Sequence, residues 1–275
     1  MSAEKATAIV IRVVDFSESS LITTLFTREF GKIHGLAKGA KRLKSPFESA
    51  LDLLALCRIV FLRKSSETFD LLTEAKLQRR FRVAGRDLSC LYAAYYVAEL
   101  LQELTDDYDP HPELFDLADE TLEALSAGES VARRVLRFEL CALRALGHLP
   151  ALEICVDCGK PVAASGPGRI AFGQLDGGVL CGGCRGGKKQ VASISPAAVR
   201  TMRELADPLR RTWQRLAIDP RLLGEIRGVL NHYLLNLLGR KPRMYDYLPL
   251  FSSERPTRAR EDNHGQGCPD AIDKG

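Results

Sequence analysis

Cys155-Val156-Asp157-Cys158 and Cys181-Gly182-Gly183-Cys184 are two Cys-x-x-Cys pairs separated by 22 residues, and they are the most specific indication in the sequence of how a part of the chain folds. Thiolates are strong ligands for Zn²⁺, and two such pairs can surround one ion with a tetrahedron of sulfurs. Because thiolates would fill all the positions, none remains for water or a substrate. The pattern therefore predicts a structural Zn²⁺ held by Cys155, Cys158, Cys181 and Cys184, which folds the segment 150–190.

Two redox-active dithiols are the alternative interpretation of these cysteines. A thioredoxin-like dithiol lies where a strand passes into a helix, and neither pair has that context. Between the pairs, a loop rich in glycine and proline contains two short apolar runs, 169–172 and 178–180, that are able to pair as strands. Gly182 to Lys188 imitates a phosphate-binding loop, but Lys189 stands where its hydroxyl residue should be. We therefore favour structural zinc.

The residues before the cysteines divide into a β-rich part and a helical part. Runs of β-branched or alternating residues lie at 7–14, 21–27, 32–38, 52–63 and 68–76. Five short strands in about 75 residues fit a small closed barrel, with the OB type as the leading candidate and an SH3-like barrel as the alternative. Beyond residue 87 the apolar residues recur with the period of helices, and helix starts are expected at Ser130, Ser195 and Asp219.

The predicted fold class is α+β. An OB-fold β-barrel occupies residues 1–80, and an α-helical bundle at 81–251 carries the zinc-binding insertion at 150–190. Residues 252–275 are polar and charged, so we expect a disordered tail there. No apolar run approaches the roughly 20 residues that span a bilayer. Met1 to Lys5 leads into no signal-peptide core, and a cytoplasmic protein is expected.

The net charge of +4 conceals an uneven distribution of charged residues. Residues 1–87 carry a net charge of +6, residues 88–131 carry −11 with no Lys or Arg, and residues 132–275 carry +9. A strongly acidic helical block therefore separates two basic parts of the chain. Such basic parts indicate a surface for polyanions.

Two groups of basic residues belong to the predicted barrel and the linker that follows it. They are Lys38, Lys41, Arg42 and Lys44 in the loop after the third strand, and Arg79, Arg80 and Arg82 beyond the last strand. These cations could follow a phosphate backbone while Phe47 or Phe81 stacks on bases. The alternative is a loop and a linker that are basic without a function. Four other phenylalanines of the barrel are expected in its core: Phe16, Phe26, Phe61 and Phe69.

A third basic group, Arg133, Arg134 and Arg137, lies on the helix next to the acidic block. A spacing of one turn places Arg137 beside one of the other two on one helix face. Ion pairing with the acidic helices is the slightly favoured interpretation. The functional alternative is a pocket for an acidic peptide tail.

These features, in this order, resemble the RecO family of bacterial recombination mediators. Lys38-Gly39-Ala40-Lys41-Arg42, with Ser45 and Phe47, is similar to the family's basic loop. Arg137-Phe138-Glu139-Leu140, the Gly147 region and the first cysteine pair resemble its junction between bundle and zinc segment. The resemblance covers residues 6–250, with one departure: Met244 and Tyr245 stand where a small hydroxyl residue is expected, so no role is transferred to them.

The resemblance implies an OB-fold that binds single- and double-stranded DNA and anneals complementary strands. It also implies cooperation with RecR in loading RecA onto DNA coated by the single-strand binding protein, whose acidic C-terminal tail is a further partner. No bond chemistry is involved, so an enzyme is not expected, and the place of action is the nucleoid. A protein-interaction scaffold with little DNA affinity is the second class of function, and an enzyme using the dithiols is the third.

Overall fold

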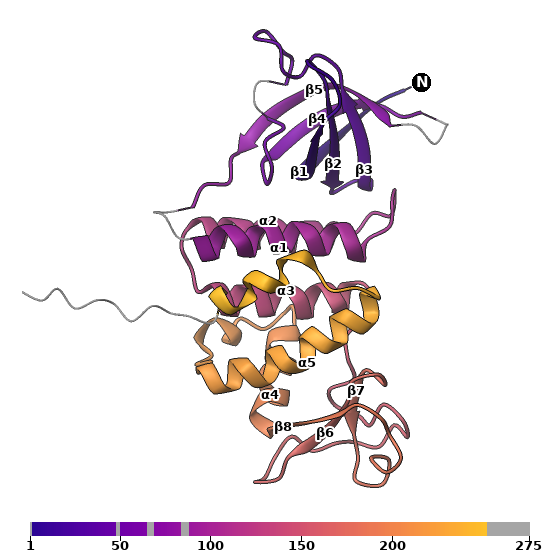
Figure 1. Ribbon diagram of the computed structural model, residues 1–275, viewed down its shortest axis with the longest axis vertical. Coiled ribbons are helices and arrows are strands. Elements are labelled where there is room, and N and C mark those ends of the chain that lie inside the picture. The colour runs from indigo at the N-terminus through magenta and orange to yellow at the C-terminus, as the bar shows by residue number, and fades with distance from the viewer. Residues whose placement is uncertain (1, 48–49, 65–68, 84–87, 252–275) are drawn as a thin grey trace, which may run out of the picture.

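The computed structural model describes residues 2–47, 50–64, 69–83 and 88–251, apart from the side chains of 248–251. The tail expected at 252–275 lies outside the described residues. Figure 1 shows an elongated molecule with a β-barrel at one end, helices in the middle and a small sheet at the other end. The division into domains at residue 80 stays a prediction.

The barrel consists of β1 (Ala3–Asp15), β2 (Leu21–Thr27), β3 (Gly31–Ala37), β4 (Leu56–Leu62) and β5 (Asp70–Arg79). The strands follow the order β1-β2-β3-β5-β4, and β1 pairs with β4 to close the barrel. The β3–β5 pair is parallel and the other pairs are antiparallel. This topology is that of an OB-fold, so the predicted fold class is confirmed.

The phenylalanines of the barrel divide differently from the prediction. Phe61 is buried inside the barrel, whereas Phe26 is buried on its outer side and stacks on Phe115 of the helices, with 6.2 Å between ring centroids. Phe16 is 58% exposed and Phe69 is 39% exposed, so their assignment to the core is wrong. Both lie at strand ends, where alternation no longer implies burial.

Phe47 is also placed differently from the prediction, because it is 2% exposed and belongs to the barrel core. The loop that carries it folds back onto β5, where the backbone N–H of Ala75 donates to the Pro46 carbonyl at 3.3 Å. A ring inside this core cannot stack on a base. The proposal that Phe47 contacts nucleic acid is therefore wrong.

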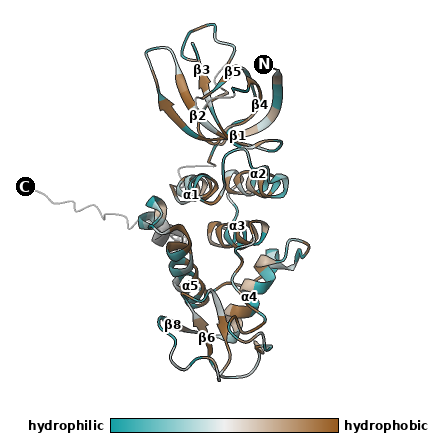
Figure 2. Ribbon diagram, turned by 90° about the vertical axis from the view of Figure 1, so that its right-hand side faces the viewer, coloured by the Kyte–Doolittle hydropathy of each residue, from teal (hydrophilic) through white to brown (hydrophobic). Residues whose placement is uncertain are grey.

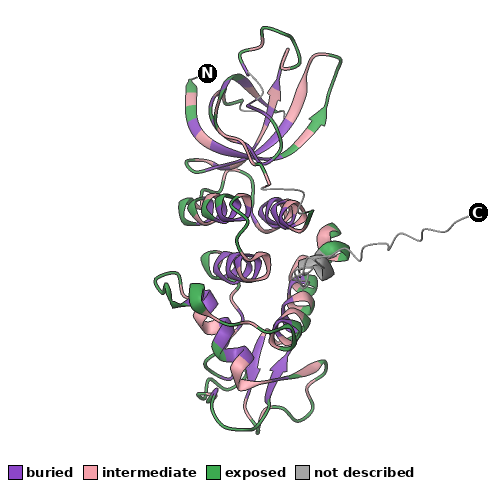
Figure 3. Cartoon of the chain, turned by 90° about the vertical axis from the view of Figure 1, so that its left-hand side faces the viewer, coloured by how far each residue is buried: buried purple, intermediate pink, exposed green. Residues whose placement is uncertain are grey.

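Within the part of the chain that the structure describes, five α-helices form the middle of the molecule: α1 (Leu88–Leu104), α2 (Pro112–Ser126), α3 (Val131–Ala145), α4 (Pro196–Ala206) and α5 (Pro220–Leu238). Two 3₁₀ helices, η1 (Thr212–Arg215) and η2 (Arg243–Phe251), complete it. Figure 2 shows α1 and α2 side by side under the barrel, with α3 in the next layer and α4 and α5 beyond it. This central position explains why most of α3 is buried (Figure 3).

The helices start at all three predicted positions, and two of the three cap residues make a side-chain hydrogen bond to the helix. The hydroxyl of Ser195 accepts from the backbone N–H of Ala198, and the carboxylate of Asp219 accepts from that of Leu222. Ser130 makes no such side-chain bond, so its predicted capping role is wrong, although α3 does start after it. Its carbonyl accepts from Arg134 N–H instead, as the first intrahelical bond.

Barrel and helices share one hydrophobic core, which fixes how the barrel sits on the bundle. Ile9, Ile11 and Phe26 on the outer side of the barrel belong to the same cluster of buried residues as the inner faces of α1 and α2. Gly31 packs so closely that a Cβ there would lie 2.1 Å from the Asp109 carbonyl oxygen, and its φ of +69° suits glycine. Lys32 Nζ donates to the Gln102 carbonyl at 2.9 Å across the same contact.

The segment between α3 and α4 contains the small sheet, with strands β6 (Ile170–Gly173), β7 (Gly178–Leu180) and β8 (Val191–Ile194) in the order β7-β6-β8. The predicted pairing of 169–172 with 178–180 is thus confirmed. Phe172 and Val179 are buried in a second core together with α4 and α5. Among the described residues, no helix is long and apolar enough to cross a membrane.

Candidate metal centre and nucleic-acid interface

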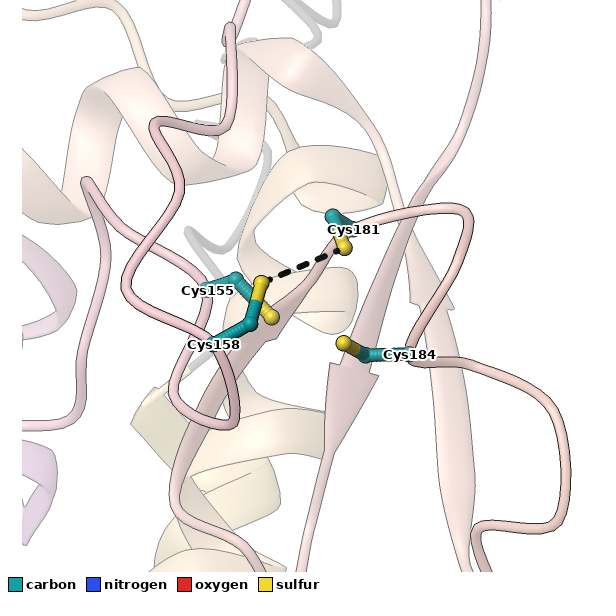
Figure 4. Close-up of side chains that lie close together, drawn as sticks. All are labelled: Cys155, Cys158, Cys181 and Cys184. Atoms are coloured by element: carbon teal, nitrogen blue, oxygen red, sulfur yellow. Dashed lines mark hydrogen bonds between the residues drawn. The ribbon is translucent and has the colours of Figure 1, made fainter.

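The cysteine sulfurs come together at the end of the molecule opposite the barrel (Figures 1 and 4). The Sγ atoms of Cys155, Cys158, Cys181 and Cys184 all lie within 4.8 Å of one another. Cys158 Sγ and Cys181 Sγ are 3.7 Å apart. Zinc–sulfur bonds of about 2.3 Å in a tetrahedron require sulfurs about 3.8 Å apart. The cluster is therefore able to hold a metal ion and fits zinc.

Two tight turns bring each pair of sulfurs to the same side. In the first, the backbone N–H of Gly159 donates to the Cys155 carbonyl at 2.9 Å, and Gly159 has a φ of +71°. In the second, Cys184 N–H donates to the Cys181 carbonyl at 3.1 Å directly after β7. Because the turns follow from local sequence, the spacing of the cysteines was enough to predict their convergence.

The surroundings of the sulfurs favour thiolates at two of the positions. Hydrogen bonds from the backbone, that of Cys181 first, lower the pKa of Cys155 to about 6. The pKa of Cys181 is lowered in the same way, chiefly by the backbone N–H of Cys184. The pKa of Cys184 is raised, because its thiol interacts with Cys158 and the other sulfurs of the cluster. Thiolates are the form that binds a metal ion.

Lys188 contributes to this centre in a way that the sequence did not indicate. Its Nζ lies 2.8 Å from Asp157 Oδ1, between the first two cysteines, and 2.7 Å from Asp176 Oδ1, in the turn between β6 and β7. One ammonium group thus joins the first cysteine turn to the sheet. In the sequence, Lys188 stood out only as part of an accidental likeness to a phosphate-binding loop. The tertiary fold is what brings the two carboxylates near this lysine.

The basic loop, residues 38–45, lies at the barrel end of the molecule. The side chains of Lys38, Lys41, Arg42 and Lys44 are exposed there, as a site for a polyanion requires. The loop is attached to the β1–β2 turn, because Lys41 N–H donates to the Ser19 carbonyl at 3.1 Å. Lys41 Nζ also pairs with Asp15 Oδ1 at 2.6 Å. The structure thus gathers these cations on one loop and orients it.

The arginines after β5 already have protein partners. Arg79 pairs with Asp119 and, at 3.2 Å, with Glu123, both of α2. Arg80 pairs with Asp52 at 3.2 Å, and Arg82 is exposed beyond it. Arg79 thus holds the end of the barrel to the bundle. These ion pairs weaken the case for Arg79 and Arg80 as phosphate ligands relative to the basic loop.

The arginines of α3 gather around Trp213, the single tryptophan of the chain. Arg134 pairs with Glu120 at 2.9 Å and with Glu129 at 2.7 Å, whereas Arg137 donates to backbone carbonyls that include Leu205 at 2.7 Å. The guanidinium carbons lie over the indole, 4.8 Å from its centroid for Arg134 and 5.1 Å for Arg137. The indole is thus stacked under two cations.

An open groove of about 510 Å³ lies beside this tryptophan. Its lining residues are Glu129, Ser130, Arg133, Arg134, Trp213 and Gln214. Arg133 donates to the Gln214 carbonyl, but its Nε is buried and has no hydrogen-bond partner among the described residues. Sequence reasoning found the arginines and missed Trp213, because it lies about 80 residues further along, in η1.

The fold and these sites define an α+β protein that joins an OB-fold barrel to a helical bundle with a four-cysteine segment. Two family models match the chain: recombination protein O N terminal over residues 1–81, and recombination protein O C terminal over residues 85–245. The chain is 42% identical over 266 residues to the DNA repair protein RecO of Rhodopirellula baltica, covering 88% of this chain and 97% of that protein.

Two further relatives carry the same name. The DNA repair protein RecO of Anaeromyxobacter dehalogenans is 34% identical over 241 residues, covering 88% of this chain and 94% of that protein. That of Bacillus pumilus is 34% identical over 230 residues, covering 83% of this chain and 87% of that protein. The chain therefore belongs to the RecO family, and its role lies in DNA repair and recombination.

Proposed function

We propose that the chain is a DNA-binding mediator without catalytic chemistry. It binds single- and double-stranded DNA through the barrel, anneals complementary strands, and acts with RecR at the nucleoid to load RecA onto DNA coated by the single-strand binding protein. The observation that carries this proposal is the exposed basic loop with Lys38, Lys41, Arg42 and Lys44 on an OB-fold barrel. Family membership supports the same role.

Charge is the physical basis of the proposed annealing activity. Two single strands repel each other through their phosphates, and cations on one surface reduce this repulsion while the bases pair. The basic loop supplies such cations, which are exposed at the end of the molecule formed by the barrel (Figure 1). Arg79, Arg80 and Arg82 are proposed as a second, weaker set of contacts, since two of them already form ion pairs.

Reversal of the loop charges tests the DNA site. The triple variant Lys41→Glu/Arg42→Glu/Lys44→Glu is expected to lose at least about tenfold in affinity for both single strands and duplexes, and to flatten the log–log salt dependence by about 2 to 3. Fluorescence anisotropy over a salt series measures both quantities. The three residues are exposed and the variant breaks a surface ion pair, that of Lys41 with Asp15, so the fold is expected to persist.

The matched control reverses the same charge at the opposite end of the molecule. Lys160, Arg185 and Lys189 are exposed in the zinc segment, and their replacement by glutamate is expected to change DNA affinity little. Equal losses in the two triple variants would point to net charge alone and contradict the assignment of the loop. A wild-type chain with weak, salt-insensitive DNA binding would favour the scaffold function instead.

The groove beside Trp213 is proposed as the site for the acidic C-terminal tail of the single-strand binding protein. An acidic peptide matches the cation of Arg133 in this groove, where Trp213 is 4% exposed and Arg134 is held by its pairs with Glu120 and Glu129. Arg137 is proposed to support the site by holding the chain before η1 through its carbonyl contacts. Through this contact the protein would reach DNA that is coated by the single-strand binding protein.

The groove is tested with a synthetic peptide of that tail. Arg133→Glu is expected to weaken peptide binding by at least about tenfold, because a carboxylate replaces a cation at the edge of the groove. Lys189→Glu, with the same charge change in the zinc segment, is the control and is expected to bind as the wild type does. Isothermal titration calorimetry gives both affinities, and unaltered binding by Arg133→Glu would contradict the site.

We also propose that the four-cysteine cluster holds a structural zinc ion. The supporting observations are the all-thiol donor set and sulfur separations that suit a tetrahedron. Its role is to hold the segment between α3 and α4 in shape, and so to support the helices that carry the groove.

A further inference from the structure

The outer face of β1, β2 and β3 carries an apolar row that the helices leave uncovered. Val14 pairs with Ile22, and Ile22 pairs with Leu36, so the three side chains project side by side from the sheet. Val14 is 41% exposed, and the other two are half-buried. The same face is covered by α1 and α2 nearer the bundle, where Ile9 pairs with Phe26.

Phe16 extends this row at the end of the barrel. It follows Val14 by two residues, which places it on the same face, and it is 58% exposed. Its backbone N–H donates to the Ser20 carbonyl at 3.1 Å and closes the β1–β2 turn. The turn is joined to the basic loop, since Gly39 N–H donates to Ser20 Oγ at 3.4 Å. The turn that carries Phe16 and the loop that carries the cations are therefore held next to each other.

Charged side chains flank the apolar row. Arg12 is exposed on one side, and Lys38 is exposed on the other, two residues beyond Leu36. Of the nearby acids, Asp15 is paired with Lys41 at 2.6 Å, and Glu18 is exposed in the turn. The negative charge of Glu18 repels a phosphate group near the turn. We therefore expect the phosphates to lie against the basic loop and the bases to lie against the turn.

We propose that this surface binds unpaired nucleobases, with Phe16 stacking on a base and the Val14–Ile22–Leu36 row contacting the neighbouring nucleotides. The inference rests on the proposed DNA-binding function and adds a preference for single strands. An aromatic ring can stack only on an exposed base face, and a duplex hides those faces between its base pairs. Annealing thus removes the stacking contact, and the duplex product is held by the loop cations alone.

Three variants at Phe16 test the stacking. Phe16→Ala and Phe16→Leu are expected to lower affinity for an oligodeoxythymidine about ten- to hundredfold, while Phe16→Trp keeps it. Affinity for a duplex of equal length is expected to stay within about twofold, with an unchanged salt dependence, because no charge is removed. Fluorescence anisotropy with both oligonucleotides gives the ratio of single-strand affinity to duplex affinity for each variant. Leu175→Ala, with 57% exposure in the turn between β6 and β7, is the matched control.

The outcomes separate this inference from the function it rests on. Unaltered single-strand affinity in Phe16→Ala, or equal losses on single strand and duplex, would overturn the stacking role while the DNA site stands. A wild-type chain that binds neither oligonucleotide would overturn both. Thermal unfolding of each variant is expected to match the wild type, since Phe16 is exposed; if Phe16→Ala melts lower but Phe16→Leu does not, the Leu variant decides.

Discussion

Replacement of Cys155 by serine is expected to abolish the proposed zinc binding and to destabilise the segment between α3 and α4. Cys155 is 1% exposed and packs against Ala171 and Leu180, so its sulfur is both a proposed ligand and a part of a small core. Structural zinc contributes about 10 to 16 kcal/mol in small zinc-finger peptides. Here Phe172 and Val179 are buried against the helices and retain part of the structure, so the expected loss is several kcal/mol.

The measurements are metal content and thermal unfolding. Wild-type protein is expected to carry about one zinc ion per chain, and Cys155→Ser none, with a melting temperature lower by about 10 °C. Cys141→Ser is the control, because Cys141 is buried outside the cluster and its thiol donates to the Leu205 carbonyl at 3.3 Å, a bond that a serine hydroxyl can also make. Full stability of zinc-free Cys155→Ser would contradict a structural role.

Cys155→Ser is expected to affect the functions of the two ends of the molecule differently. The cysteine cluster lies at the end opposite the barrel (Figure 1), so Cys155→Ser is expected to bind single-stranded DNA as the wild type does. Binding of the acidic peptide is expected to weaken, since Trp213 shares its core with Phe172 and Val179.

Replacement of Glu139 by alanine is expected to destabilise the bundle by about 3 to 5 kcal/mol. Glu139 of α3 is fully buried, accepts from the Tyr96 hydroxyl at 2.6 Å and pairs with Arg227 of α5. The Nε and Nη1 atoms of Arg227 are buried without a hydrogen-bond partner among the described residues. Burial also lowers the pKa of Arg227, because the low-dielectric interior disfavours the charged guanidinium.

Urea unfolding of the single and double variants measures how far the stability depends on the Glu139–Arg227 pair. Because the loss comes mainly from an unpaired buried charge, Glu139→Ala/Arg227→Met is expected to recover a large part of the stability lost in Glu139→Ala. The control is Asp246→Asn, which breaks the exposed Lys241–Asp246 pair and is expected to cost at most about 1 kcal/mol. Additive losses in the double variant would show that the pair does not act as a unit.

The contrast between Phe47 and Phe16 shows where the sequence pattern fails. Alternation is kept along β2, where Leu25 faces the barrel core and Phe26 faces the helices, but the pattern alone assigned Phe26 to the wrong one of the two faces. It could not show that β1 ends at Asp15, which leaves Phe16 outside, or that the loop with Phe47 folds inward. Exposure at a strand end depends on the closure of the whole barrel, and no local window of sequence contains that information.

The binding partners of the arginines likewise could not be predicted from the neighbouring residues in the sequence. Their positions in the sequence were identified, but Arg79 meets Asp119, and Arg137 meets the carbonyl of Leu205, 68 residues away. For Arg134, ion pairing with the acidic helices was the favoured interpretation, and its pairs with Glu120 and Glu129 agree with it. A guanidinium group can bind a phosphate or a protein carboxylate equally well, so only its neighbours in space distinguish the two.

The cysteine spacing, the strand and helix periods and the helix starts at Ser195 and Asp219 were readable from the chain, because turns, pleats and caps depend on residues a few positions apart. Folding in three dimensions was needed to bring Trp213 under Arg134 and Arg137, to place Lys188 between two aspartates and to expose Phe16 beside the basic loop. Each of these contacts joins segments that lie far apart along the backbone, and packing of the barrel, the helices and the small sheet creates it.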